Sequence, residues 1–347
     1  MLRFLTAGES HGEALIGILE GMPAGLKITA ADINKDLGRR QEGYGRGQRM
    51  RIERDTARIL SGTMKGATIG SPIAILIGNK DFSIDTLPAV KNPRPGHADL
   101  AGILKYGFKD ARCVLERASA RETAARVGVG AICKVLLKEF GITFASRVLM
   151  IGGAETERSM KEKIDSAMKS KDTVGGVFEI TVKGVPPGLG SCAHWDRRLD
   201  ASLAAAVMSI PAVKAVEIGN GIESSGKPGS KTHDEIFYSG KKCFYRKTNN
   251  AGGIEGGMSN GEDIIARGYM KPISTLMEGL NTVDIDTKKQ VRASTERSDV
   301  CAVPAAGVVG ESVSALVIAG EFLEKFGGDS LSETRRNYKG YIESLKI

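Results

Sequence analysis

The sequence has little aromatic character and no ordered pattern of cysteines. Phenylalanine, tryptophan and tyrosine make up 5% of its 347 residues, whereas proteins that bind single-stranded nucleic acids usually present stacking aromatics among their basic residues. No CxxC pair occurs among the five cysteines, so neither a zinc site nor a disulfide framework is predicted. We therefore expect a reduced, cytoplasmic protein without a bound metal.

Signals for targeting and for several common enzyme classes are also missing. The N-terminal segment MLRFLTAGESHG becomes polar too soon for a signal peptide. The most apolar stretch, residues 304–320, contains Glu311 and several glycines, so no membrane-spanning segment is predicted. The chain has no tandem repeat, no Walker A loop and no nucleophile elbow, which argues against a P-loop nucleotide enzyme and against an α/β-hydrolase.

What the sequence does contain is a segment dense in arginine and glycine at residues 39–55, RRQEGYGRGQRMRIERD. Arginines this close together repel one another unless an anion binds among them, and the guanidinium fork suits a carboxylate or a phosphate. The glycines allow the backbone to turn sharply and approach a ligand. A net charge of +8 also favours an anionic partner. For this segment alone, a solvated basic loop or a nucleic-acid patch remains an alternative.

Only four histidines occur, and two of them lie in glycine-flanked loops. His11 is in GESHGE and His97 is in PRPGHAD, positions from which an imidazole can reach a ligand and transfer protons near neutral pH. A surface or turn histidine is the alternative for each of them. His194 and His233 have less distinctive neighbours and are interpreted as ordinary surface residues.

A long helix is predicted over residues 116–141, where Ser119 followed by Glu122 fits a capping box. Arg117 and Arg121 are four residues apart and are expected on one face of the helix start. The capping box explains the serine and the glutamate, but not two arginines at the positive end of a helix dipole. A phosphate-binding helix start is therefore predicted.

The rest of the pattern mixes strands and helices without regular alternation, which favours an α+β fold with largely antiparallel sheets. The length allows one large domain or two. Strands are predicted at residues 2–6, 68–79, 176–185, 212–221 and 263–270. Helices are predicted at residues 29–39, 159–170 and 196–210, within 296–327 from Pro304 onwards, and as a polar helix or tail over the last twenty residues.

Six groups of motifs together resemble one known family, chorismate synthase. They follow the family's order from residue 8 to residue 311 and so cover nearly the whole chain, which makes the resemblance highly specific. The motifs are GESHG at 8–12, GYGRGQRMRIERD at 43–55, RPGHAD at 94–99, RASARETAAR at 117–126, NNAGGIEGGMSNGEDI at 249–264 with KPIST at 271–275, and RSDVCAVPAAGVVGE at 297–311.

The resemblance implies a lyase of the shikimate pathway that converts 5-enolpyruvylshikimate 3-phosphate to chorismate and phosphate by a 1,4-anti elimination. It also implies a need for reduced FMN (FMNH2), which we expect an external flavin reductase to supply, with NADPH as the other source of electrons. The anionic groups of the substrate and the flavin phosphate account for an arginine-lined site. The implied fold is a β-α-β sandwich with two largely antiparallel sheets enclosing helices. A single domain over residues 1–347, with a C-terminal helix or tail from about 328, would assemble as a homotetramer.

Position by position, the resemblance also implies roles for individual residues. His11 would act as the acid that assists phosphate departure, and His97 would protonate or stabilise the reduced flavin near N1. Asp299 would sit beside the flavin N5 and help relay the proton removed from substrate C6. The substrate anions would be held by Ser10, Arg40, Arg46, Arg49, Arg94 and Arg121. The flavin would be held by Arg117, Ala118, Ser119, Pro211, Ala212, Gly256, Lys271, Pro272, Ile273, Ser274, Thr275 and Arg297. Pro211 has no N–H, so a flavin contact there must use its carbonyl or its neighbour.

Two other functions stay open at this point. A nucleic-acid-binding protein would use the arginine-rich segment, but polymer binding gives no reason for His11, His97 and Asp299 in three separate loops, and its affinity would fall steeply with salt. A phosphate-handling enzyme of the same fold with a different substrate would keep all of these residues. Titration with substrate analogues would separate that case.

Overall fold

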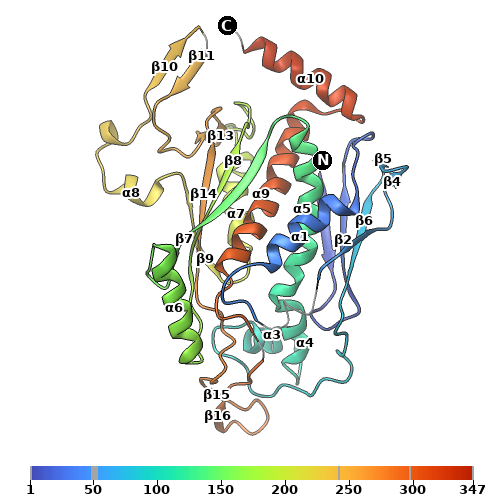
Figure 1. Cartoon of the computed structure of the whole chain (residues 1–347), viewed down its shortest axis with the longest axis vertical. Helices are drawn as coiled ribbons and strands as arrows, with labels where there is room; N and C mark the ends of the chain where they lie inside the picture. Colours follow the sequence, from blue (N-terminus) through green and yellow to red (C-terminus); the bar gives the residue numbers. More distant parts are fainter. Residues whose placement is uncertain (1, 48–53, 241–242, 297, 346–347) are drawn as a thin grey trace.

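Two four-stranded sheets lie on opposite sides of a layer of helices in the computed structural model, which describes every residue except 1, 48–53, 241–242, 297 and 346–347 (Figure 1). Their strand orders are β1-β2-β6-β3 and β7-β8-β14-β9, and every pairing is antiparallel. The strands of the first sheet are β1 Arg3–Ala7, β2 Ala14–Glu20, β6 Ile73–Gly78 and β3 Ala57–Ile59. Those of the second are β7 Thr143–Ile151, β8 Gly176–Lys183, β14 Ile264–Met270 and β9 Val213–Ile218.

The helices between the sheets form the centre of the molecule (Figure 1). They are α1 Ala30–Gln41, α5 Thr123–Lys138, α7 Leu199–Met208 and α9 Val303–Phe326. α5 packs on β2 and β6, α9 packs on β7 and β8, and the two helices pack on each other. Both are apolar around most of their circumference, as expected for helices enclosed in a core. The expected α+β sandwich of antiparallel sheets around helices is confirmed.

Glycines on α5 allow close packing on both sides of that helix. A methyl group on Gly130 would lie 2.6 Å from the carbonyl oxygen of Ser312 on α9. A methyl group on Gly128 would lie 2.5 Å from the side chain of Ile75 on β6. The contact to Ser312 involves backbone, so α9 would have to move to accommodate a larger residue at position 130.

Gly130→Ala is therefore expected to destabilise the protein by about 2 kcal/mol through overpacking. Urea unfolding followed by circular dichroism measures the change. Gly320→Ala is the matched control, because a methyl group at Gly320 on α9 would meet nothing within 4 Å and alanine favours the helix. A Gly130→Ala protein as stable as the wild type would contradict this account of the α5–α9 contact.

Most of the predicted elements are confirmed within a few residues. The helix expected at 29–39 is α1, with Thr29 as its N-cap. Pro304 lies in the first turn of α9. Within the C-terminal twenty residues, the segment Leu331–Ser344 forms α10, and the Tyr338 ring packs against Phe322 and Phe326 of α9. By length and composition α9 could cross a membrane, but 83% of its apolar window is buried inside the protein.

The helix predicted at 116–141 is interrupted, which corrects the prediction of a single element. α4 Arg112–Ala118 ends before Ser119, whose backbone is extended at φ −65° and ψ 142°. A 3₁₀ turn, η1 Ala120–Glu122, and then α5 follow. Ser119 caps η1 by accepting from the Arg121 N–H, while Glu122 pairs with Arg126. The local spacing alone could not reveal this break, because it is held by contacts to distant residues.

The sequence pattern also fails to predict β7. Ser146 and Arg147 interrupt its apolar alternation, and most of its residues are only partly buried. The strand forms because it pairs with β8 along nearly its whole length, so tertiary pairing overrides a weak local pattern.

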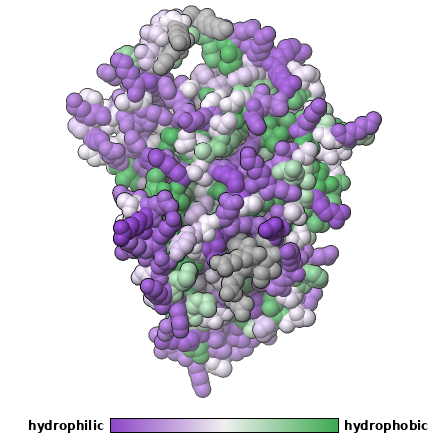
Figure 2. All heavy atoms as spheres, viewed as in Figure 1, coloured by the Kyte–Doolittle hydropathy of each residue, from purple (hydrophilic) through white to green (hydrophobic). Residues whose placement is uncertain are grey.

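Shorter elements surround the sandwich. They are the hairpins β4 Thr63–Met64 with β5 Ala67–Thr68, β10 Ile236–Ser239 with β11 Cys243–Arg246, β12 Ile254–Glu255 with β13 Met258–Ser259, and β15 Asn281–Val283 with β16 Gln290–Arg292. Among the described residues, the remaining helices are α3 Asp99–Tyr106, α6 Glu157–Lys169, α8 Gly221–Ser225, η2 Trp195–Arg197 and η3 Gly229–Lys231. The face in Figure 2 carries mainly polar side chains with apolar areas between them.

Candidate active site

Asp55 is a buried carboxylate that accepts from two arginines. Nη1 of Arg40, near the end of α1, lies 3.5 Å from Oδ2, and Nη1 of Arg121, in η1, lies 2.6 Å from Oδ1. All three residues are at most 5% exposed. Arg40 also donates to the Thr123 hydroxyl and the Ala120 carbonyl. These bonds lock the end of α1 to the break that precedes α5.

The glycine-containing segment 43–47 packs against the segment that leads into α9. The Asp299 carboxylate accepts from the Gly47 N–H at 2.6 Å and pairs with Arg46 Nη1 at 2.6 Å. Gly45 has a φ of +86°, a left-handed conformation that favours glycine. Two motifs from opposite parts of the chain thus place Arg46 and Asp299 in contact.

Positive charge exceeds negative charge in this cluster. The pKa of Arg40 is lowered to about 10, chiefly by burial; the charges of Asp55 and Asp299 act to raise it, and those of Arg46 and Arg121 act to lower it. Three arginines here face two carboxylates. Arg46 Nε is buried, and no described residue accepts a hydrogen bond from it. A buried guanidinium N–H normally has an acceptor. An anionic group bound here would supply one and would reduce the repulsion.

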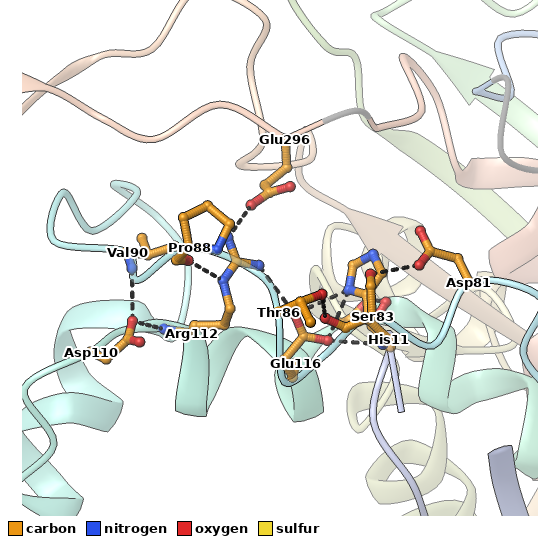
Figure 3. A network of polar contacts seen from close by, with 12 residues as sticks. His11, Asp81, Ser83, Thr86, Pro88, Val90, Asp110, Arg112, Glu116 and Glu296 are labelled. Carbon is orange, nitrogen blue, oxygen red and sulfur yellow. Dashed lines mark hydrogen bonds and ion pairs between the residues drawn. The ribbon is translucent and has the colours of Figure 1, made fainter. Parts of the chain in front are cut away.

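His11 is held by a buried carboxylate beside this cluster (Figure 3). Its Nδ1 lies 2.9 Å from Glu116 Oε2, and its backbone N–H donates to the same oxygen at 2.9 Å. Arg112 Nη1 approaches the other oxygen, Oε1, at 3.3 Å. Burial would raise the pKa of Glu116, but the hydrogen bonds from His11 and Arg112 outweigh it and the pKa is lowered. The histidine therefore faces an ionised partner.

Serine hydroxyls connect His11 to the arginines. The Ser10 N–H donates to the Glu116 carbonyl, and its hydroxyl lies 3.3 Å from that of Ser119. Arg121 Nε donates to the Asn79 side chain at 2.9 Å, and Asn79 in turn donates to carbonyls of the 9–12 loop. The 8–12 loop and η1 are therefore parts of one site. Arg117 donates to the Thr6 and Gly8 carbonyls. Because the helix breaks at Ser119, Arg117 and Arg121 do not share one continuous helix face, which corrects that expectation.

A second histidine is held in a similar way at the start of α3. His97 Nδ1 pairs with Asp99, which is fully buried. Arg94 donates through Nε to Asp99 at 2.9 Å and through Nη1 to the Thr275 hydroxyl at 2.7 Å. Burial would raise the pKa of Asp99, but the bonds from His97 and Arg94 lower it far below its usual range. Arg94 therefore holds the histidine–aspartate pair to the segment that follows β14.

The segment Lys271–Thr275 lies against two other predicted positions. The Lys271 N–H donates to the Ala212 carbonyl at 2.9 Å, so Pro211 and Ala212 border this segment. The pKa of Lys271 is lowered by burial and by the charge of Lys214, which leaves a second position with excess positive charge. The Ile273 carbonyl accepts from the Thr173 hydroxyl. This contact links the Lys271–Thr275 segment to the arginine cluster. The backbone N–H of Val174, next to Thr173, donates to the carbonyl of Val300, next to Asp299.

Some predicted residues do not join these clusters. Gly256 lies in the β12–β13 hairpin, whereas Lys271 follows the opposite end of β14. β14 has seven residues and is about 23 Å long at the rise of a strand. Within one chain, Gly256 is therefore remote from Lys271. Arg49 and Arg297 lie outside the described residues.

The structure also identifies residues that the sequence reasoning did not single out. They are the acidic and amide side chains Asp55, Asn79, Asp99 and Glu116, and the cation Arg112. Asp55 and Asp99 end two of the quoted motifs, and Glu116 directly precedes a third. Proximity to those motifs was the only signal in the sequence. Their burial and their partners come from long-range contacts.

These clusters define a class of protein. Buried arginines that lack sufficient counter-charge, together with two histidine–carboxylate pairs, suit an enzyme that binds a small polyanion and moves protons on it.

A family model described as chorismate synthase matches residues 2–323. Chorismate synthases of Thermoanaerobacter pseudethanolicus and Caldanaerobacter subterraneus are 56% and 57% identical to the chain, each over 99% of both chains. A crystal structure of chorismate synthase is similar with a TM-score of 0.83 and 42% identity, covering 99% of this chain and 98% of that one.

The chain belongs to the chorismate synthase family and is accordingly an enzyme of the lyase class that acts in the shikimate pathway. The resemblance seen in the six motif groups is confirmed. A small-molecule substrate follows from this identity, in agreement with the excess positive charge of the arginine cluster.

Proposed function

We propose that the protein converts 5-enolpyruvylshikimate 3-phosphate to chorismate by a 1,4-anti elimination of phosphate that requires reduced FMN. The observation that carries this proposal is the cluster of Arg40, Arg46 and Arg121 with too little counter-charge, joined to His11 and Asp299. In this reaction the bond to phosphate breaks, a proton leaves C6, and a new double bond forms. The protein must therefore bind anions, supply one proton and accept another.

Binding of the substrate anions falls to the arginine cluster. Arg46 Nε offers a buried donor, and Arg40 and Arg121 add positive charge beside it. Ser10 lies within the same network. Arg94 holds His97 and Asp99, so we assign it the positioning of the second histidine. Arg49 is included in the proposed set because it lies in the family motif at residues 43–55.

The described residues also fit a flavin phosphate. Lys271 is partly buried next to another cation. The Lys271–Thr275 segment borders Ala212, which has an unusual backbone conformation with a φ of +68°. Arg117, Ala118 and Ser119 lie at the helix break, and Arg297 completes the proposed set on its motif. Reduced FMN, when bound, would supply electron density that assists the elimination, although the reaction is redox-neutral overall. Gly256 enters this set only by resemblance.

Two residues are proposed to move the protons. His11 donates a proton to the departing phosphate, since it is fixed beside the cluster that holds anions. Asp299 is proposed to help relay the proton removed from C6, and its bonds with Arg46 and the Gly47 N–H orient its carboxylate. His97 is proposed to stabilise the reduced flavin near N1, with Asp99 as its partner.

An anaerobic assay tests the proposal. Purified protein is mixed with 5-enolpyruvylshikimate 3-phosphate and FMN reduced by dithionite, and chorismate is followed by its ultraviolet absorbance. Product with reduced but not with oxidised FMN is the expected result. NADPH without dithionite is expected to give no product unless a flavin reductase is added. If flavin and substrate both bind but no chorismate forms, the proposed reaction is wrong and a related phosphate-bearing substrate becomes the alternative.

Asp299→Asn is expected to bind substrate and flavin normally but to lower kcat by about 100-fold, because an amide can accept the Gly47 N–H bond but cannot take up a proton. Asp165→Asn is the control, because Asp165 pairs with the exposed Tyr44 hydroxyl. The comparison is made in the same anaerobic assay. Near-normal turnover by Asp299→Asn would remove the proton relay from this residue.

We also propose that the chain forms one domain and assembles as a cytoplasmic homotetramer, with no nucleic-acid or membrane partner. The outer face of the first sheet supports the assembly, because Leu5 is 66% exposed and is paired across the strands with the partly exposed Ile18. An uncovered apolar sheet face favours association. Sedimentation equilibrium measures the mass, and a monomer at all concentrations would contradict this part.

A further inference from the structure

The described groups that bond the Glu116 carboxylate are the backbone and ring of His11 and the guanidinium of Arg112 (Figure 3). Oε2 accepts from the His11 backbone N–H and faces His11 Nδ1, each at 2.9 Å. Oε1 lies 3.1 Å from the same Nδ1 and 3.3 Å from Arg112 Nη1. Glu116 is 3% exposed, so water does not compete for these bonds. A carboxylate in such surroundings acts purely as an acceptor.

This arrangement selects one tautomer of His11. Because an ionised carboxylate has no proton to give, Nδ1 must carry the proton in the bond with Glu116. In the neutral ring Nε2 is then the basic nitrogen, and it is Nε2 that gains and loses the proton. The backbone bond from His11 to the same carboxylate also fixes the loop on which the ring stands.

Glu116 is itself held by a second layer of contacts. Arg112, one turn earlier on α4, donates through Nε to the Pro88 carbonyl at 2.6 Å and through Nη2 to Glu296 at 3.1 Å. Asp110 accepts from the backbone N–H groups of Arg112 and Val90 and so anchors the start of α4. Glu296 belongs to the segment that leads to Asp299. The carboxylate beside His11 is thereby connected to the segment that carries Asp299.

We propose that Glu116 is a positioning residue for the reaction: it keeps a proton on Nδ1 of His11, so that Nε2 is the nitrogen that takes up a proton and, from the imidazolium, gives it to the departing phosphate, and Arg112 keeps Glu116 in place. The kinetic part of this inference rests on the proposed function, whereas the tautomer does not. His97, Asp99 and Arg94 repeat the same construction, with a buried carboxylate between a histidine and an arginine.

Glu116→Gln tests the proposal, because glutamine keeps the shape but replaces one acceptor oxygen with an NH2 donor. At least one of the donors around position 116 then faces another donor, and the ring can turn to its other tautomer. In the Ser-His-Asp triad of the serine proteases, replacing the carboxylate by an amide gives the wrong tautomer and a large loss of kcat. Glu179→Gln is the matched control, because Glu179 is also 3% exposed but pairs with Arg147 and Arg267.

The first readout is the ¹⁵N NMR spectrum of the histidine rings of the full chain, recorded between about pH 6 and pH 10 so that the neutral rings are seen. His11 is assigned from the signal lost in His11→Ala. The wild type and Glu179→Gln are expected to show the Nδ1–H form of His11, and Glu116→Gln the Nε2–H form or a mixture. An Nε2–H form in the wild type, or an unchanged tautomer in folded Glu116→Gln, overturns the proposal. The wild-type result decides even if the variant fails to fold.

The second readout is kinetic. Glu116→Gln is expected to lower kcat by about 100-fold while KM for the substrate changes by less than about threefold, because the tautomer matters for proton transfer rather than for anion binding. Glu179→Gln is expected to keep both constants. Equal losses in kcat and affinity would show a merely structural role and overturn the proposal. If the wild type makes no chorismate but His11 is the Nδ1–H tautomer, the proposed reaction fails while the pairing stands.

Discussion

His11→Ala is expected to lower kcat by about 10²–10⁴-fold while flavin binding is retained. The imidazole is the proposed donor of the proton to the departing phosphate, and without it that group must leave as a more highly charged anion. The arginine cluster and Glu116 are still present in the variant, so binding of the anions should change little. His11 bonds Glu116, whereas the Lys271–Thr275 segment bonds Thr173 and Arg94, so flavin binding should be preserved.

Turnover with dithionite-reduced FMN and flavin binding by fluorescence titration measure the two parts of this prediction. His194→Ala is the matched control, since His194 also pairs through Nδ1 with a carboxylate, that of Asp196, but its side chain is 62% exposed. That variant should retain wild-type kcat. Unchanged turnover in His11→Ala would remove the residue from the mechanism, and loss of flavin binding would give it a structural role instead.

Glu311→Gln is expected to destabilise the protein by about 3 kcal/mol, the effect of breaking an ion-pair network by removing the charge of its fully buried carboxylate. Glu311 is fully buried on α9. Its carboxylate accepts from Arg39 at 2.6 Å, from Lys134 at 2.7 Å and from the Ser146 hydroxyl at 2.7 Å. These partners come from α1, α5 and β7, so one carboxylate joins the helix layer to the second sheet. Arg39 directly precedes Arg40, which links the network to the arginine cluster.

The same carboxylate should make stability depend on pH. Burial would raise the pKa of Glu311, but the bonds from Arg39 and Lys134 lower it from 4.5 to about 2. The folded protein therefore binds this proton less readily than the unfolded chain. The contribution of about 3 kcal/mol is fully present above pH 4.5, declines as the pH falls, and is lost below about pH 2.

Urea unfolding of the wild type and Glu311→Gln at several pH values tests both statements. The difference between them should be largest near neutral pH and should shrink below pH 4.5. Glu324→Gln is the control, because Glu324 lies on the same helix and pairs with Arg197, but its side chain is 59% exposed, where an ion pair contributes little. Equal stability of the wild type and Glu311→Gln at neutral pH would contradict the assigned role of the network.

The outcome at particular residues shows how far the sequence could be interpreted. The sandwich, α1 and α9 were predictable, because the motifs resemble one family and because capping and apolar spacing are local properties. The break at Ser119 was not, since it depends on Arg40 donating to the Ala120 carbonyl from a distant helix. β7 was not predicted either, because its pairing with β8 compensates for a weak pattern.

By itself, the sequence determined the family, the fold class and the presence of arginines, histidines and one aspartate in the right motifs, because these depend on residue identity and spacing along the chain. Only the tertiary structure decided which carboxylates accompany them: Asp55 between two arginines, Glu116 on His11 and Asp99 on His97. It also placed Arg117 and Arg121 in different helical elements, α4 and η1, and Gly256 and Lys271 at opposite ends of β14. Charge compensation and burial depend on distances between residues far apart in sequence, and local spacing does not carry that information.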